Sequence, residues 1–387
     1  MAANDRGVTE PGHGPPARLR VALDATPLHG ARTGIGAFVH GAMTALAERP
    51  ELDVRGYAVT WRGRHAIAGH LPVGVPLAGR PVPAQVVTRL WRSADVPPIE
   101  WWGGTHDVVH GTNFVVPPSR RAAMVVSVHD LTPLRFPEMC TPHTRTFPAL
   151  VRRALQRGAW VHVDSAFVGA EVVELLGADP GRVVHVPLGV PGAQTLAGAD
   201  PVEGHRLAGG DRYVLAMGTV EPRKSLTDLV TAFDLLAHDD PELRLVVAGP
   251  DGWGVEVLAR AIRDARHRDR IVRLGWLDDG QRDAVLRGAS ALAYPSRYEG
   301  FGLPPLQAMA AGVPVVATDA GSLVEVLGDA ALLVPVGDPR ALAEGLATVL
   351  ADPGDRVARG RVHAASFTWE RCAAGLAALY TRAAGDR

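Results

Sequence analysis

The C-terminal half of the chain alternates short apolar runs with longer stretches of helical spacing. The apolar runs have the length of strands and occupy residues 213–217, 243–248, 271–274, 291–294, 314–317 and 331–334. Helical spacing fills the intervals at residues 225–237, 254–267, 281–287, 304–311 and 340–350. Continuous apolar strands separated by helices are typical of a parallel sheet buried on both faces. This half is therefore predicted to be a Rossmann-like domain.

The N-terminal half repeats this rhythm less regularly. Its strand-like runs are residues 20–23, 54–59, 108–110, 125–128, 161–164 and 183–186, and a first helix is predicted over 35–47. Residues 61–105 interrupt the pattern with many prolines, several arginines and four tryptophans, which we interpret as an insertion near a pocket mouth. Three interpretations of these tryptophans stay open. They pack in a core, they line an acceptor pocket, or they form a membrane-facing patch with the nearby Arg80, Arg89 and Arg92.

The length of 387 residues is about twice that of a usual domain, which favours two domains. We place their boundary between residues 189 and 210, where glycine, alanine and proline dominate. The expected order is a disordered tail over 1–17, Rossmann-like domains over 18–195 and 205–365, and a helix over 366–387 that crosses back to the first domain. Two such domains should face each other at the carboxyl ends of their strands, where open parallel sheets bind ligands.

The composition of the chain limits which kinds of partner and location are expected. A net charge of −1 and 21% charged residues lack the basic field of a nucleic-acid-binding protein. No apolar run approaches the roughly 20 residues that span a bilayer, and two cysteines are too few for a disulfide framework. A cytoplasmic location is expected, with peripheral contact at the inner face of the membrane as an alternative.

A first candidate motif is Gly218-Thr-Val-Glu-Pro-Arg-Lys224, between the first strand and the first helix of the second domain. Lys224 is the one lysine among 40 basic residues. A guanidinium, an ammonium and helix-terminal amides together suit a diphosphate, although a solvated charged turn is the plain alternative.

The most specific motif is Tyr298-Glu-Gly-Phe-Gly-Leu-Pro-Pro-Leu-Gln-Ala-Met309, directly after the strand that ends at Tyr294. Gly300 and Gly302 let the backbone approach a ligand closely, and a proline suits the first turn of the next helix. We expect Glu299 to be an exposed carboxylate that binds sugar hydroxyls, and Gln307 to reach a ribose. A helix start with an acidic cap is the alternative.

Two further segments of the N-terminal half carry candidates. Thr33-Gly-Ile-Gly36 lacks the third glycine of a dinucleotide fingerprint, so it is interpreted as a loop whose amides touch the donor phosphate, or as a plain helix start. His110 and His129-Asp130 end neighbouring apolar runs, and both histidines are expected to point into the cleft. There a histidine can bond a sugar hydroxyl or the attacking acceptor, and Asp130 can orient that histidine or another polar partner. A structural histidine at the end of a strand is the alternative. No metal-binding constellation stands out, and none is expected.

Taken together, these segments resemble glycosyltransferase family 4, the retaining GT-B group that includes bacterial mannosyltransferases. The similar pieces are Asp24 to Leu28, Thr33 to Gly36, Val128 to Pro133, Val183 to Val190, Gly218 to Lys224, Glu299 to Met309, and Ala320 to Ser322 with Glu325. The resemblance implies an α/β GT-B fold with the acceptor in the first domain and a nucleotide diphosphate sugar in the second.

The resemblance also implies the roles of individual residues. The implied catalytic residues are His129, Asp130, Arg223, Lys224 and Glu299. The implied donor-binding residues add Gly34, Gly36, Thr219, Leu277, Gly300, Phe301, Gly302, Leu303 and Gln307, and His110 and His129 are assigned to the acceptor. Gln307 departs from the usual second glutamate of the family, and Asp164-Ser165 departs from a usual Ser-Glu.

The predicted function is a metal-independent retaining hexosyltransferase without a cofactor, with GDP-mannose as the preferred donor and an unknown acceptor. A UDP-sugar or dTDP-deoxysugar donor is the near alternative. Two other classes stay open, a NAD-dependent oxidoreductase and a non-catalytic nucleotide-sugar sensor.

Overall fold

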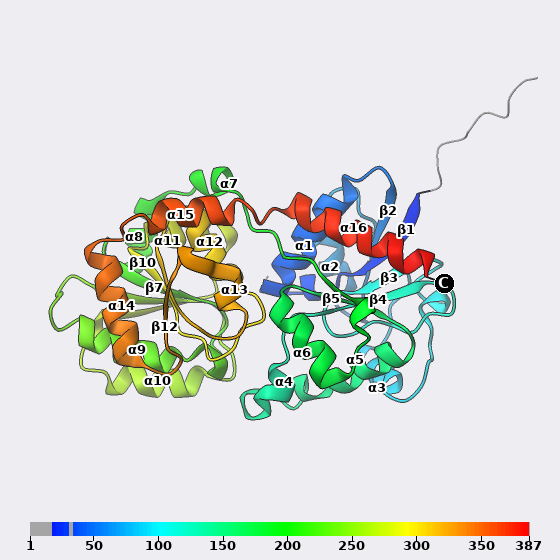
Figure 1. Cartoon of the computed structure of the whole chain (residues 1–387), viewed down its shortest axis with the longest axis horizontal. Helices are drawn as coiled ribbons and strands as arrows, with labels where there is room; N and C mark the ends of the chain where they lie inside the picture. Colours follow the sequence, from blue (N-terminus) through cyan, green and yellow to red (C-terminus); the bar gives the residue numbers. More distant parts are fainter. Residues whose placement is uncertain (1–17, 31–33, 387) are drawn as a thin grey trace, which may run out of the picture.

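The structure is a computed structural model that describes residues 18–30 and 34–386 as two α/β domains lying side by side (Figure 1). The tail expected over residues 1–17 lies outside the described residues, as does Thr33 of the Thr33-Gly-Ile-Gly36 segment.

The N-terminal domain is built on a six-stranded parallel sheet of order β2-β1-β3-β4-β5-β6. Its strands are β1 (Leu19–Asp24), β2 (Leu52–Tyr57), β3 (Val108–Gly111), β4 (Ala123–Val128), β5 (Trp160–Val163) and β6 (Val183–His185). The helices are α1 (Gly34–Ala47), α2 (Arg64–His70), α3 (Ala84–Trp91), α4 (Thr132–Arg135), α5 (Phe147–Gln156) and α6 (Ala166–Leu176). β3 and β4 are buried along their whole length, as expected of strands covered on both faces.

The C-terminal domain repeats the plan with the order β12-β11-β10-β7-β8-β9, again all parallel. Its strands are β7 (Tyr213–Met217), β8 (Arg244–Ala248), β9 (Ile271–Gly275), β10 (Ala291–Tyr294), β11 (Val315–Thr318) and β12 (Leu332–Val334). The helices are α7 (Ala193–Ala197), which packs on α12, α8 (Pro201–Ala208), α9 (Leu226–Leu236), α10 (Val255–Asp264), α11 (Asp279–Gly288), α12 (Leu303–Ala311), α13 (Leu323–Leu327), α14 (Pro339–Ala351) and α15 (Arg356–Ala364). The six strands predicted for each half are confirmed, and with them the α/β class.

The domain boundary predicted between residues 189 and 210 from its glycine, alanine and proline content contains two helices, α7 and α8. Asp200 caps α8 by accepting a hydrogen bond from the Val202 amide at 2.9 Å, and Gly209 ends the helix in the left-handed region. Gly204 lets α8 pack directly on α11, since a Cβ there would lie 2.2 Å from the Ala284 carbonyl. The helix is thus specified by caps and a glycine contact rather than by an apolar stripe.

The last helix, α16 (Trp369–Gly385), leaves the C-terminal domain and packs on α1 and on β3 and β4 of the N-terminal sheet (Figure 1). Its first residue, Trp369, lies so close to α1 that a Cβ on Gly41 would be 2.3 Å from the indole. The chain therefore joins the two domains twice, once through the segment between β6 and α7 and once through the segment before α16 (Figure 1).

The four tryptophans of residues 61–105 divide into two kinds. Trp91 and Trp102 are buried, stack with centroids 6.4 Å apart and pack beside Tyr57, so for these two the core-packing interpretation is right. Trp61 and Trp101 are 65% and 60% exposed. None of the four lines the cavities described below.

Candidate active site

Two adjoining cavities lie between the domains at the carboxyl ends of both sheets. The large cavity, about 520 Å³, extends into the C-terminal domain, and the small cavity, about 240 Å³, extends toward the N-terminal sheet. They share the lining residues Gly34, Gly218, Thr219, Leu303 and Pro304. The position agrees with the binding edge of open parallel sheets.

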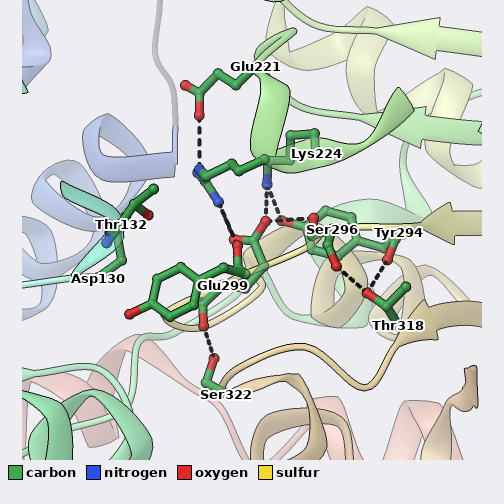
Figure 2. A network of polar contacts seen from close by, with 12 residues as sticks. Asp130, Thr132, Glu221, Lys224, Tyr294, Ser296, Glu299, Thr318 and Ser322 are labelled. Carbon is green, nitrogen blue, oxygen red and sulfur yellow. Dashed lines mark hydrogen bonds and ion pairs between the residues drawn. The ribbon is translucent and has the colours of Figure 1, made fainter. Parts of the chain in front are cut away.

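A buried cluster of charges forms one wall of the small cavity (Figure 2). Glu299 accepts hydrogen bonds from Lys224 at 2.6 Å and from Ser296 at 2.7 Å, and its second oxygen lies 2.8 Å from the Arg223 guanidinium. Arg223 also pairs with Glu221 at 2.9 Å, and the Lys224 ammonium donates to the Tyr294 hydroxyl. The cluster holds two cations and two carboxylates, so its charges balance.

This cluster corrects the expectation that Glu299 is an exposed carboxylate. The residue is only 5% exposed, because the loop after β10 folds under the turn that carries Arg223 and Lys224. Burial alone would raise the pKa of Glu299, but the two cations outweigh it and lower that pKa to about 2. Burial lowers the pKa of the Lys224 ammonium despite the facing carboxylate.

Two glycines of the Tyr298 to Met309 motif are required, one by a close contact with the other domain and one by its backbone conformation. A Cβ on Gly300 would lie 1.6 Å from the carbonyl oxygen of His129, so only glycine fits where the two domains meet. Gly302 has a φ of 100°, a left-handed conformation that glycine adopts without strain, and α12 then begins with Pro304 in its first turn. Phe301 and Leu303 are buried and line the small cavity with these glycines.

His129 stands on the opposite wall of the small cavity, directly after β4. Its Nδ1 lies 2.6 Å from Asp164 Oδ2 and its Nε2 lies 2.8 Å from the carbonyl oxygen of Thr112. Burial opposes protonation of the ring, yet Asp164 raises the pKa of His129 above its usual value. Of the two roles expected of Asp130, orienting His129 belongs to Asp164 instead, while Asp130 accepts a hydrogen bond from another polar group, the Thr132 amide, at 2.9 Å.

The assignment of His110 to the acceptor is also wrong. Its side chain is fully buried, with Nδ1 2.7 Å from the Tyr380 hydroxyl and Nε2 2.8 Å from Ser127 Oγ. Because α16 covers this part of the sheet, both ring nitrogens are used inside the protein. His110 is a structural strand-end histidine.

The large cavity collects the remaining donor-binding candidates. Thr219, Leu277 and Gln307 line it, together with Gly249, Pro250, Trp276 and Asp278. Gln307 is half-buried on the first turns of α12, and Gly34 opens α1 beside both cavities. Gly36, two residues further along α1, is buried and lines neither of these two cavities.

Asp164 and Glu221 belong to the site although no sequence motif singled them out as functional residues. Asp164 follows β5 directly, and β5 pairs with β4 in a register that puts Val163 beside Val128. The strand-end rule applied to His129 would therefore have found Asp164. Glu221 lies within the first motif, but its pairing with Arg223 depends on the turn geometry.

Within residues 18–30 and 34–386 no group of three or more His, Cys, Asp or Glu side chains is arranged to hold a metal ion. In the same part of the chain no helix is long and apolar enough to cross a membrane.

Comparisons with known proteins agree with this geometry. Residues 202–362 match the family model for glycosyl transferases group 1. O-antigen chain mannosyltransferase B of Escherichia coli is 31% identical over 273 residues, which cover 68% of this chain and 71% of that protein. D-inositol 3-phosphate glycosyltransferase of Kribbella flavida is 34% identical over 55% of this chain and 54% of its own length.

Solved structures share the fold at low identity. Sucrose-phosphate synthase of Thermosynechococcus elongatus superimposes with a TM-score of 0.73 at 20% identity, covering 96% of this chain and all of that one. HepE of Anabaena, solved with UDP and glucose, gives a TM-score of 0.72 at 16% identity over 94% of this chain and all of its own. The alternative of a nicotinamide-dependent oxidoreductase is therefore set aside. The chain belongs to the group 1 glycosyltransferases, as its resemblance to family 4 predicted, and its two domains form a GT-B fold.

Proposed function

We propose that this glycosyltransferase moves a hexose from a nucleoside diphosphate sugar to an acceptor that enters from the N-terminal domain, with retention of anomeric configuration and without a metal ion. The observation that carries the proposal is the Arg223-Lys224-Glu299 cluster at a cavity whose other wall is His129.

The cavities suggest how the donor is divided. The nucleoside occupies the large cavity beside Leu277 and Gln307, whose amide both donates and accepts hydrogen bonds to ribose hydroxyls. The diphosphate lies by Gly34, Gly218 and Thr219, which line both cavities. The hexose then occupies the small cavity, near Gly300.

In the proposed reaction the bond between the anomeric carbon and the departing diphosphate breaks as the acceptor oxygen bonds to that carbon from the same face. The acceptor proton passes to an oxygen of the departing phosphate. Arg223 and Lys224, which line the small cavity, stabilise the negative charge that develops there, and charges fixed in advance at such a point are usually the largest catalytic contribution. These two cations also take over the role that a metal ion has in other transferases.

For the donor we propose GDP-mannose, supported by the E. coli relative described as a mannosyltransferase. UDP-sugars are the principal alternative, supported by the HepE structures solved with UDP and with UDP-glucose. A dTDP-deoxysugar stays a third candidate. Gln307, which carries no charge, is where nucleotide preference is expected to differ from relatives with a glutamate.

A thermal-shift panel tests the donor, because a ligand of the native state raises the melting temperature by mass action. GDP and GDP-mannose should stabilise the protein more than UDP, UDP-glucose, dTDP or NAD. Purified protein should then hydrolyse the best donor slowly, and it should do so equally with and without EDTA. Stabilisation without hydrolysis or transfer would favour a nucleotide-sugar sensor. Loss of activity in EDTA that Mg²⁺ restores would contradict metal independence, and NMR of the product reports retention or inversion.

We also propose peripheral membrane contact through the exposed Trp61 and Trp101. Exposed Arg80, Arg89 and Arg92 lie in the same segment, and arginines beside exposed indoles suit an anionic lipid surface. Sedimentation with anionic but not zwitterionic vesicles should follow, and the Trp61→Ser/Trp101→Ser double variant should stay in the supernatant. Equal sedimentation of both proteins would remove this proposal.

A further inference from the structure

The edge where β4 and β5 end carries a side-chain pair that the proposed reaction does not use. Val128 and Val163 are register partners, so the next residues, His129 and Asp164, lie beside each other at the carboxyl edge of the sheet. Their side chains are only 10% and 2% exposed, and their nearest atoms are 2.6 Å apart. The pair lines the small cavity opposite Glu299.

The two partners of the His129 ring determine its protons. The carbonyl oxygen of Thr112 can only accept a hydrogen bond, so Nε2 carries a hydrogen. An ionised Asp164 also only accepts, so Nδ1 carries a second hydrogen. With both nitrogens protonated the ring is an imidazolium. The other arrangement is a neutral ring beside a protonated Asp164.

The charges around the cavity decide between these two arrangements. Apart from His129, the titratable or charged groups that line it are Asp130, Asp164, Glu221, Arg223, Lys224, Tyr294 and Glu299, and His110 and His162 approach the ring from β3 and β5. Among the lining residues four are carboxylates, whereas Arg223 and Lys224 are the only fixed cations. Like Asp164, but more weakly, Asp130 favours a positive charge on His129. His110 and His162, by contrast, are pushed toward the neutral form by burial, which lowers the pKa of each.

We infer that Asp164 is a positioning residue that holds His129 as an imidazolium at the wall of the cavity, so that His129 serves the transfer as a fixed cation and not as a proton acceptor. A ring with two committed N–H groups has no lone pair for an acceptor hydroxyl. The charge of His129 instead adds to those of Arg223 and Lys224 where the diphosphate leaves. This inference rests on the proposed function for its catalytic part, but the charge of His129 can be measured without any donor.

One oxygen of Asp164 supports a role beyond stability. Asp164 Oδ1 is buried without a hydrogen-bond partner, and His162 Nε2, 3.7 Å away, is already bonded to the Val186 carbonyl at 3.0 Å. A half-satisfied buried carboxylate costs stability, and a neutral asparagine would fit the same space. The presence of an aspartate at position 164 is explained if its negative charge is needed to keep His129 protonated.

Asp164→Asn is the appropriate variant, because its amide can donate to Nδ1 while Nε2 still donates to Thr112. The hydrogen bonds of the ring are kept and only the charge is lost. The first measurement is the ¹H–¹⁵N spectrum of the imidazoles at neutral pH, with the His129 signals identified by their loss in His129→Gln. Both nitrogens of wild-type His129 should have protonated shifts, and Asp164→Asn should convert the ring to a neutral Nε2–H tautomer. Asp130→Asn is the matched control and should leave the imidazolium in place.

The second measurement is kinetic. Asp164→Asn is expected to lower kcat by about 10- to 100-fold while the donor KM changes by less than about threefold. Because the pKa of His129 is raised, the imidazolium is fully present at pH values below the usual pKa of histidine and is lost as the pH rises through the raised pKa. The kcat of wild type should therefore fall on the alkaline side of its pH profile. That fall should be absent in Asp164→Asn.

A neutral His129 in the wild-type spectrum overturns the inference, whatever the kinetics show. A charged His129 together with wild-type kcat in a folded Asp164→Asn variant overturns its catalytic part. If no donor supports turnover, the proposed function fails while the spectrum still decides the charge.

Discussion

The hydroxyl of Tyr380 on α16 lies 2.7 Å from Nδ1 of His110 on β3, a contact between residues 270 positions apart. It is the first link in a line of buried hydrogen bonds that runs across three strands. His110 Nε2 contacts Ser127 Oγ at 2.8 Å, Ser127 Oγ contacts His162 Nδ1 at 2.8 Å, and His162 Nε2 reaches the Val186 carbonyl at 3.0 Å.

The direction of this line follows from its last member. The Val186 carbonyl only accepts, so His162 carries its hydrogen on Nε2 and accepts from Ser127 at Nδ1. Ser127 then accepts from His110 Nε2, and His110 accepts from Tyr380. Every group is satisfied with both rings neutral, in agreement with the lowered pKa of each. The line fixes α16 to the sheet that carries His129.

Tyr380→Phe should destabilise the N-terminal domain by about 1 to 2 kcal/mol, because it leaves Nδ1 of His110 buried without a donor. The check is the free energy of unfolding from a denaturant titration. Thr381→Ala is the control, since Thr381 is exposed on the same helix and bonds only within it. Equal stability of Tyr380→Phe and Thr381→Ala would argue against the line as a stabilising element.

Lys224→Ala should lower kcat/KM for the best donor by about 10²- to 10³-fold, because it removes a buried cation from the site of charge development. Lys224→Arg is the matched variant, which keeps the charge but replaces a compact ammonium by a planar fork. Its loss should be smaller. Normal turnover in Lys224→Ala would show that Lys224 has been assigned the wrong role.

Glu299→Gln should destabilise the protein at neutral pH by about 3 kcal/mol, the equivalent of lowering a carboxyl pKa from its usual value to about 2. A carboxylate whose pKa is lowered in the folded protein contributes stability at pH values above its usual pKa. That contribution is lost as the pH falls from the usual pKa toward the lowered pKa. The gap between wild type and Glu299→Gln should therefore narrow below about pH 4.5.

Thermal melts of both proteins from neutral to acidic pH measure this gap. The exposed Glu256→Gln serves as control and should melt like wild type throughout. A gap for Glu299→Gln that does not change with pH would mean that the ion pairs are not its source.

Gly300→Ala should abolish transfer, with at least about a 100-fold loss of kcat, while each domain still folds. The added Cβ would overlap the His129 carbonyl oxygen, so the domains have to separate by more than a small side-chain adjustment. Small-angle scattering should report a more open particle, and circular dichroism should be unchanged. Gly69→Ala on α2 adds the same atom in open space and should be silent. An active Gly300→Ala enzyme would mean that this closed contact is not needed for transfer.

Local patterns were sufficient for much of this protein. Continuous apolar runs such as residues 291–294 are typical of strands buried in a parallel sheet, so the hydrophobic pattern was enough to predict the strands of both halves and the two-domain plan. The same rule put Lys224 and Glu299 after strands, at the edge where ligands bind. Neither inference needed a partner distant in sequence.

The state of each site residue was decided by tertiary structure. Glu299 is buried because a turn 75 residues away covers it, His129 is paired across 35 residues with Asp164, and His110 is hidden by a helix from the end of the chain. Sequence spacing determines that a side chain lies at the edge of a sheet, but its partner, its burial and hence its charge depend on which elements dock there. For that reason Asp164, and not the adjacent Asp130, orients His129.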